Sequence, residues 1–150
     1  MKIRLVWVGK TRDKNWKALQ DEYIRRLSHF VQFQIAEVKD AGPGEGKEIE
    51  GKRILQILNQ KTFVVVLDTA GKQLSSHELA AEIEGWQLRG IKEIVFIIGG
   101  ADGIALDVGQ KADFSLSLSF LTFTHEMARV ILLEQLYRAF TIIRGFPYQK

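Results

Sequence analysis

Three short segments and one histidine are the residues of this chain with the clearest potential for ligand chemistry. The segments are 68–71 (DTAG), 99–103 (GGADG) and 118–124 (LSFLTFT), and His125 directly follows the third. Each segment ends a run typical of a strand, and ligands bind beyond the carboxyl ends of strands in open parallel sheets. Glycine there allows positive φ and close approach of a ligand. By itself, GGADG is more typical of a tight strand-to-helix turn than of a nucleotide-contacting loop.

The chain lacks the residues that several other kinds of ligand site and catalytic site require. The chain has neither Gly-x-Gly-x-x-Gly opening a helix after the first strand nor Gly-x-x-x-x-Gly-Lys-Ser/Thr, so neither NAD nor ATP is expected. It has no cysteine, which excludes thiolate nucleophiles and cysteine-bound metals. His29 and His77 fall on polar faces of predicted helices, and no histidine belongs to a cluster with metal-ligand spacing. We expect no metal.

Strand and helix patterns alternate along the whole chain. Apolar or alternating runs predict strands at 3–8, 31–38, 63–67, 94–98 and 114–120. Helical spacing predicts helices at 13–30, 105–111 and 124–144, and another helix after the loop 41–46. A further helix is predicted to begin at the capping box of Ser75 and Glu78 and to end at Gly90. This order predicts an α/β fold, with a mostly parallel sheet flanked by helices, in a single domain covering 1–150.

The last predicted helix is apolar around much of its circumference. Its apolar residues are Met127, Val130, Ile131, Leu132, Leu133, Leu136, Tyr137, Phe140, Ile142 and Ile143. A helix on the surface of a single domain has a narrower apolar stripe than this one. We therefore expect a homodimer that buries this helix. The alternative is a helix buried inside one chain.

Positive charge concentrates at the two ends of the chain. Residues 1–30 carry eight Lys/Arg against three Asp/Glu, and residues 126–150 carry four against two. If the ends meet, they form one positive face suited to a polyanion, although a solvated helix face explains the charges equally well. No run approaches the length of a membrane span, and the N-terminus lacks a signal-peptide pattern. We therefore expect a cytoplasmic protein without a membrane partner.

Several short motifs occur in a distinctive order. They are Leu67-Asp68, Gly99-Gly100-x-x-Gly103, Leu118-Ser119-x-Leu121-Thr122-Phe123 before His125, Arg129-Val130, Glu134-Gln135-x-Tyr137-Arg138-Ala139 and Pro147-Tyr148. Each is modestly specific, but their order and spacing over essentially the whole chain are highly so. In these motifs the sequence resembles the ribosomal RNA large subunit methyltransferase H family, pseudouridine N3-methyltransferases of the SPOUT class.

The resemblance implies a fold, a cofactor and a substrate. The fold would be an α/β domain whose C-terminal helix passes through a loop in a deep trefoil knot. The cofactor would be S-adenosyl-L-methionine, held by Leu67, Gly99, Gly100, Leu118, Ser119, Phe120, Leu121, Thr122 and Phe123. The enzyme would be a homodimer, joined through its C-terminal helix, that methylates N3 of a pseudouridine in 23S rRNA on the assembled ribosome.

The resemblance also implies catalytic residues. His125 would position the base or take its proton, Tyr148 would pack on or bond to the base, and Lys150 would stabilise the developing anion or grip a phosphate. Arg129 is a second candidate cation, although an ion pair with Glu126 or Glu134 explains it better. Family members commonly have histidine where this chain has Gln149, which puts the assignment of the general base in doubt.

Three other functions remain open at this stage. The chain could be a SPOUT methyltransferase acting on tRNA, but it lacks the substrate-domain extension that such an enzyme would carry. It could be a ribosome-binding protein that has lost catalysis, which failure to bind S-adenosylmethionine would indicate. It could also be a small nucleotide-binding module, but the missing phosphate-binding loops make this the weakest alternative.

Overall fold

The computed structural model describes residues 1–148, and within them five parallel strands form one sheet in the order β2-β1-β4-β3-β5. The strands are β1 (Lys2–Val8), β2 (Gln32–Val38), β3 (Phe63–Gln73), β4 (Glu93–Ile98) and β5 (Phe114–Ser117). The helices are α1 (Lys14–Leu27), α2 (Lys47–Gln56), α3 (Ser76–Leu88), α4 (Leu106–Gln110) and α5 (His125–Arg144). The predicted α/β fold with a parallel sheet is confirmed.

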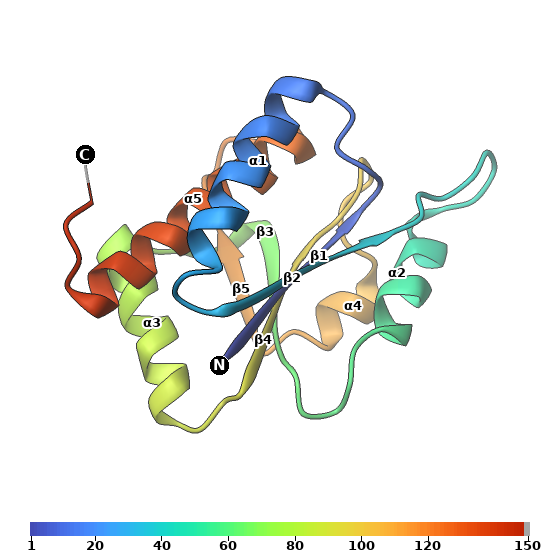
Figure 1. Ribbon diagram of the computed structural model, residues 1–150. Helices are drawn as coiled ribbons and strands as arrows, with labels where there is room; N and C mark the ends of the chain where they lie inside the picture. Colours follow the sequence, from blue (N-terminus) through green and yellow to red (C-terminus); the bar gives the residue numbers. More distant parts are fainter. Residues whose placement is uncertain (149–150) are drawn as a thin grey trace.

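Helices cover both faces of the sheet. Helices α1, α3 and α5 lie on one face, and α2 and α4 lie on the other (Figure 1). Side chains alternate accordingly along the central strands: Leu5 and Trp7 of β1 point into the core under α1, α3 and α5, whereas Val6 points into the core under α2 and α4. Burial on both faces explains the continuous apolar runs at 5–8 in β1 and 94–98 in β4.

Local capping fixes where the long helices begin and end. The carboxylate of Asp13 accepts hydrogen bonds from the first-turn amides of α1, and Ser75 and Glu78 form the predicted capping box at the start of α3. Helix α5 begins after Thr124, whose side chain accepts from the amide of Met127. It ends at Gly145, which adopts φ 67°, a left-handed conformation that glycine adopts without strain.

Two strand ends differ from the predictions by more than one residue. Strand β3 continues past Leu67 to Gln73, because Leu67 and Lys72 both pair with Leu116 and the intervening residues 68–71 bulge out of the ladder. Strand β5 stops at Ser117 instead of continuing to Phe120. There the hydroxyl of Ser117 donates to the carbonyls of Thr69 and Ser119, at 3.0 and 3.1 Å, and the chain turns away.

Helix α5 is buried largely within its own chain. It packs between α1 and α3, and its core residues are Leu132, Leu133, Leu136, Ala139 and Phe140. The apolar character of α5 therefore follows from packing inside one chain, which was the alternative explanation. The homodimer remains a prediction that must rest on other grounds. Among residues 1–148, every helix is too short or too polar to cross a bilayer.

Candidate active site

A cavity of about 700 Å³ opens at the carboxyl ends of β3, β4 and β5. Its walls come from the three segments singled out in the sequence and from the start of α5. The lining residues are Leu67, Asp68, Thr69, Ile98, Gly99, Gly100, Ala101, Gly103, Ile104, Leu118, Ser119, Leu121, Thr122, Phe123, Thr124, His125 and Ala128. The fold thus brings together segments that lie about 50 residues apart in the chain.

The glycine segment after β4 is both a tight turn and a wall of the cavity. Gly103 adopts φ 82°, and its amide donates to the carbonyl of Gly100 at 3.0 Å, which folds the segment back on itself. A Cβ on Gly99 would lie 2.5 Å from the carbonyl oxygen of Gly103. No larger residue fits at this position unless the backbone moves. The explanation of GGADG as a tight turn is confirmed, and contact with a nucleotide stays a prediction.

The segments after β3 and β5 are held against each other. The bond from Ser117 to the carbonyl of Thr69 joins them, and each segment also has its own turn. The carboxylate of Asp68 accepts from the amide of Ala70 at 2.9 Å, and the hydroxyl of Ser119 accepts from the amide of Leu121 at 3.0 Å. These contacts hold both walls in place.

His125 lies at the mouth of the cavity. It is the first residue of α5, it is exposed, and it contributes to the lining together with Ala128 one turn further on. An exposed imidazole at the edge of a cavity can donate or accept a hydrogen bond, or take a proton, from a molecule bound there. No group of three His, Cys, Asp or Glu side chains in residues 1–148 is arranged to hold a metal ion.

Comparison with known proteins identifies the family. The model of the predicted SPOUT methyltransferases matches residues 1–149. The chain belongs to the SPOUT methyltransferase family. It is 41% identical to the ribosomal RNA large subunit methyltransferase H of Acetivibrio thermocellus and 43% identical to that of Halothermothrix orenii, and each alignment covers the whole of both chains. These relatives place it in the large subunit methyltransferase H group.

One solved structure supports the fold alone. A probable methylase family protein from Haemophilus influenzae superposes with a TM-score of 0.59 at 13% identity, over 99% of this chain and 70% of that one. The arrangement of strands and helices is therefore shared with a methylase, while the chemistry must be argued from the residues.

The cofactor-binding residues predicted for this SPOUT-family chain line the cavity, with one exception. Phe120 is not part of the lining, and 72% of its side chain is exposed. The alternation of the sequence placed Phe120 on a strand, but β5 has already ended three residues earlier. Phe120 instead exposes its apolar surface next to Leu121, which lines the cavity and is itself exposed.

Arg129 behaves differently from either prediction made for it. Its side chain is fully buried, so it is not a cation facing the substrate. It makes no ion pair with Glu126 or Glu134: within residues 1–148 it binds the carbonyl of Val8 at 2.6 Å and the hydroxyl of Thr11 at 2.9 Å. Burial lowers the pKa of Arg129. The bond to Val8 spans 121 residues, and no local pattern in the sequence could reveal it.

Tyr148 lies far from His125 along α5. His125 begins the helix, and Tyr137, against which Tyr148 packs, is about 18 Å further along the helix axis. The ring of Tyr148 packs edge-on against Tyr137 with 4.9 Å between ring centroids, and Arg138 stacks on it. Burial is the main reason that the pKa of Tyr148 is raised. One chain does not bring Tyr148 to His125, and Lys150 lies outside the described residues.

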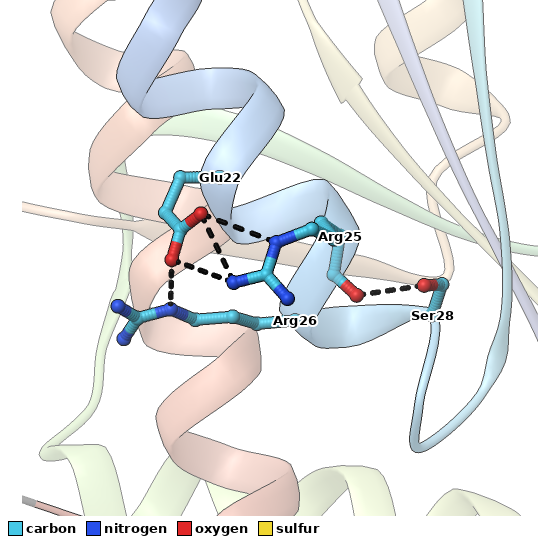
Figure 2. Close-up of polar contacts among 4 residues, drawn as sticks. All are labelled: Glu22, Arg25, Arg26 and Ser28. Atoms are coloured by element: carbon cyan, nitrogen blue, oxygen red, sulfur yellow. Dashed lines mark hydrogen bonds and ion pairs between the residues drawn. The ribbon is translucent and has the colours of Figure 1, made fainter.

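The two charged ends do meet, because α1 and α5 pack side by side, but many of their charges are paired. Figure 2 shows Glu22 of α1 between Arg25 and Arg26, with its closest contact 2.7 Å from Nε of Arg26. On α5, Arg138 pairs with Glu134 at 2.6 Å. The predicted positive face is thus partly neutralised, and its free cations lie elsewhere on α1 and in the segment that precedes it.

Proposed function

We propose that this chain transfers a methyl group from S-adenosyl-L-methionine to N3 of a pseudouridine in 23S rRNA, within the assembled ribosome. The observation that carries the proposal is the coincidence of a cavity built from the three β-strand ends with an exposed histidine at its mouth. Full-length relatives named ribosomal RNA large subunit methyltransferase H support the substrate class.

The residues of the cavity fit S-adenosylmethionine. A volume of about 700 Å³ is in the range of sites that hold small organic ligands. Leu67, Leu118 and Leu121 supply apolar surface for an adenine ring and for the methylene groups next to the sulfonium. Glycine at Gly99 and Gly100 keeps the shape of the cavity wall, because a Cβ would press on Gly103 at the first position and on Val8 and Glu50 at the second. When bound, this cofactor would supply a methyl group activated by the positive charge of its sulfur.

The chain's own residues must then orient the acceptor and accept its proton. N3 of a uracil-type base carries a weakly acidic N–H, so its nucleophilicity depends on a partner for that proton. His125 is the lining residue best suited to this role, because its imidazole is exposed at the mouth. The rigid walls around it hold the acceptor in place, and orientation of this kind contributes much of the rate in a displacement reaction.

The proposed enzyme is a homodimer with a knotted C-terminal region. Phe120 exposes apolar surface outside the cavity lining, and such surface is suited to a subunit contact. If Tyr148 acts on the base bound at His125, it must come from a second copy, because within one chain Tyr148 packs against Tyr137, about 18 Å along α5 from His125. The dimer would therefore build the site from both chains.

A nucleoside analysis tests the proposal. Ribosomes from a strain that lacks the gene are incubated with the protein and S-adenosylmethionine, and the large-subunit RNA is digested for mass spectrometry. We expect pseudouridine to gain the mass of one methyl group. His125→Ala should lower the initial rate about a hundredfold or more while still binding the cofactor. Near-normal methylation by this variant would exclude the role of His125, and methylation of another nucleoside would exclude the substrate.

A further inference from the structure

The segment 10–14, which leads from the end of β1 into the first residue of α1, carries cations that have no acidic partner. Lys10, Arg12 and Lys14 are all exposed, and within residues 1–148 none of them forms a salt bridge. Their neighbours on α1 differ: Lys17 pairs with Asp21 at 3.0 Å, and Arg25 and Arg26 share Glu22 (Figure 2). The free positive charge of this end of the chain is thus concentrated in residues 10–14.

Helix α5 holds this segment in place. The amide of Arg12 donates to the carboxylate of Glu126 at 2.7 Å, and Arg129 donates to the hydroxyl of Thr11 at 2.9 Å. The hydroxyl of Thr11 in turn donates to Gln20 at 2.6 Å, and Gln20 is itself buried. Cations on a segment that is already ordered lose less conformational entropy on binding than cations on a free loop.

The same contacts place the segment beside the cavity. Glu126, which binds the amide of Arg12, directly follows His125, and Arg129 lies one helical turn beyond His125. Val8, at the end of β1, lies against the glycine segment, since a Cβ on Gly100 would be 3.2 Å from its side chain. Figure 1 shows the segment at the same end of the sheet as the turn after β4.

We propose that Lys10, Arg12 and Lys14 bind backbone phosphates of the ribosomal RNA next to the target nucleotide. The proposal rests on the proposed function and adds to it the surface by which the RNA is held. Unpaired Lys and Arg side chains on an ordered segment complement a polyphosphate backbone and release its counterions on binding. Such contacts fix the position of the RNA without reading its sequence.

A pair of matched triple variants tests this surface. The test variant is Lys10→Ala/Arg12→Ala/Lys14→Ala. The control is Lys61→Ala/Arg89→Ala/Lys92→Ala, which removes two lysines and one arginine that are also exposed and unpaired within residues 1–148 but lie at the opposite end of the sheet. For each protein, kcat and KM for ribosomes are measured at several salt concentrations, and binding of S-adenosylmethionine and of ribosomes is measured separately.

The test variant should raise KM for ribosomes roughly tenfold or more, with kcat and cofactor binding close to those of the wild type. Its affinity for ribosomes should also depend less on salt, with a log–log slope smaller by about two for three lost phosphate contacts. The control should match the wild type. A test variant with the KM and salt slope of the control would overturn the proposal, and so would a loss confined to kcat or cofactor binding. If the wild type methylates no RNA, the proposed function fails, and the salt slopes for ribosome binding still decide the role of this surface.

Discussion

The guanidinium group of Arg129 donates a hydrogen bond of 2.6 Å to the carbonyl oxygen of Val8, which joins α5 to the end of β1. The same group lies 4.7 Å from the centre of the indole ring of Trp7, and the whole side chain is buried. Within residues 1–148 no carboxylate pairs with this charge, so a carbonyl, a hydroxyl and an aromatic face replace the water it has lost. Arg129 thus couples the start of α5, where His125 lies, to the sheet.

Replacing Arg129 with lysine should destabilise the fold although the charge is kept. An ammonium group cannot reproduce the planar fork that reaches Val8 and Thr11 together while stacking on Trp7. We expect Arg129→Lys to lower the free energy of unfolding by about 1–3 kcal/mol in urea titrations. Arg144→Lys makes the same exchange at an exposed position near the end of α5 and should have no effect. Equal stability of the two variants would show that the geometry of Arg129 is unimportant.

Because Gly99 and Gly103 lie close together, a side chain introduced at Gly99 should impair cofactor binding. A methyl group on Gly99 would lie 2.5 Å from the carbonyl oxygen of Gly103, so the turn must shift. Gly99→Ala should weaken binding of S-adenosylmethionine by about 1–3 kcal/mol, measured by calorimetry. Gly85→Ala is the control: a Cβ there meets nothing within 4 Å, and in the interior of α3 it should stabilise the protein by about 0.5–1 kcal/mol. Unchanged cofactor binding by Gly99→Ala would mean that this turn does not hold the cofactor.

The sequence predicts the elements and the loops that line the cavity well, because both depend on local patterns. Buried parallel strands are continuous apolar runs, and the capping box at Ser75 marks the start of α3 directly. The errors arise where distant parts of the chain decide the structure. The end of β5 depends on its pairing with the bulged part of β3, and this pairing removes Phe120 from the strand.

Charged residues were the hardest to predict. Counting Lys and Arg located a positive end but could not show that Glu22 neutralises Arg25 and Arg26, which requires the helical turn between them (Figure 2). Arg129 has acidic neighbours at helical spacing, so an ion pair was the natural expectation. Its real partner is a backbone carbonyl, and every residue carries one, so side-chain patterns hold no information about it.

The separation of His125 and Tyr148 predicts complementation between chains. If a site takes His125 from one copy and Tyr148 from the other, a heterodimer of His125→Ala and Tyr148→Ala chains contains one intact site. We therefore expect each variant alone to be impaired and a refolded equimolar mixture to recover about a quarter of the wild-type rate. The control is the same mixture without refolding. A rate no greater than the mean of the two separate variants would contradict a site shared between chains.

The capping box predicts how stability changes in acid. The hydrogen bond from the amide of Ser75 holds the pKa of Glu78 below its ordinary value of 4.5. The contribution of this carboxylate is therefore complete above pH 4.5 and is lost as the pH falls through the lower pKa of the folded state. Glu78→Gln should show a smaller loss of stability than the wild type over this interval in pH-dependent urea titrations. The control is Glu84→Gln, an exposed substitution on α3, whose loss of stability in acid should equal that of the wild type. The same loss in Glu78→Gln and the wild type would show that the capping box does not form.

The transfer of labelled methyl groups from S-adenosylmethionine tests the central claim most directly. The acceptors are assembled ribosomes, isolated large subunits and bulk tRNA from a strain that lacks the gene. We predict label in large-subunit RNA, greatest with assembled ribosomes, and none in tRNA. Label in tRNA, or cofactor binding without transfer to any RNA, would contradict the account.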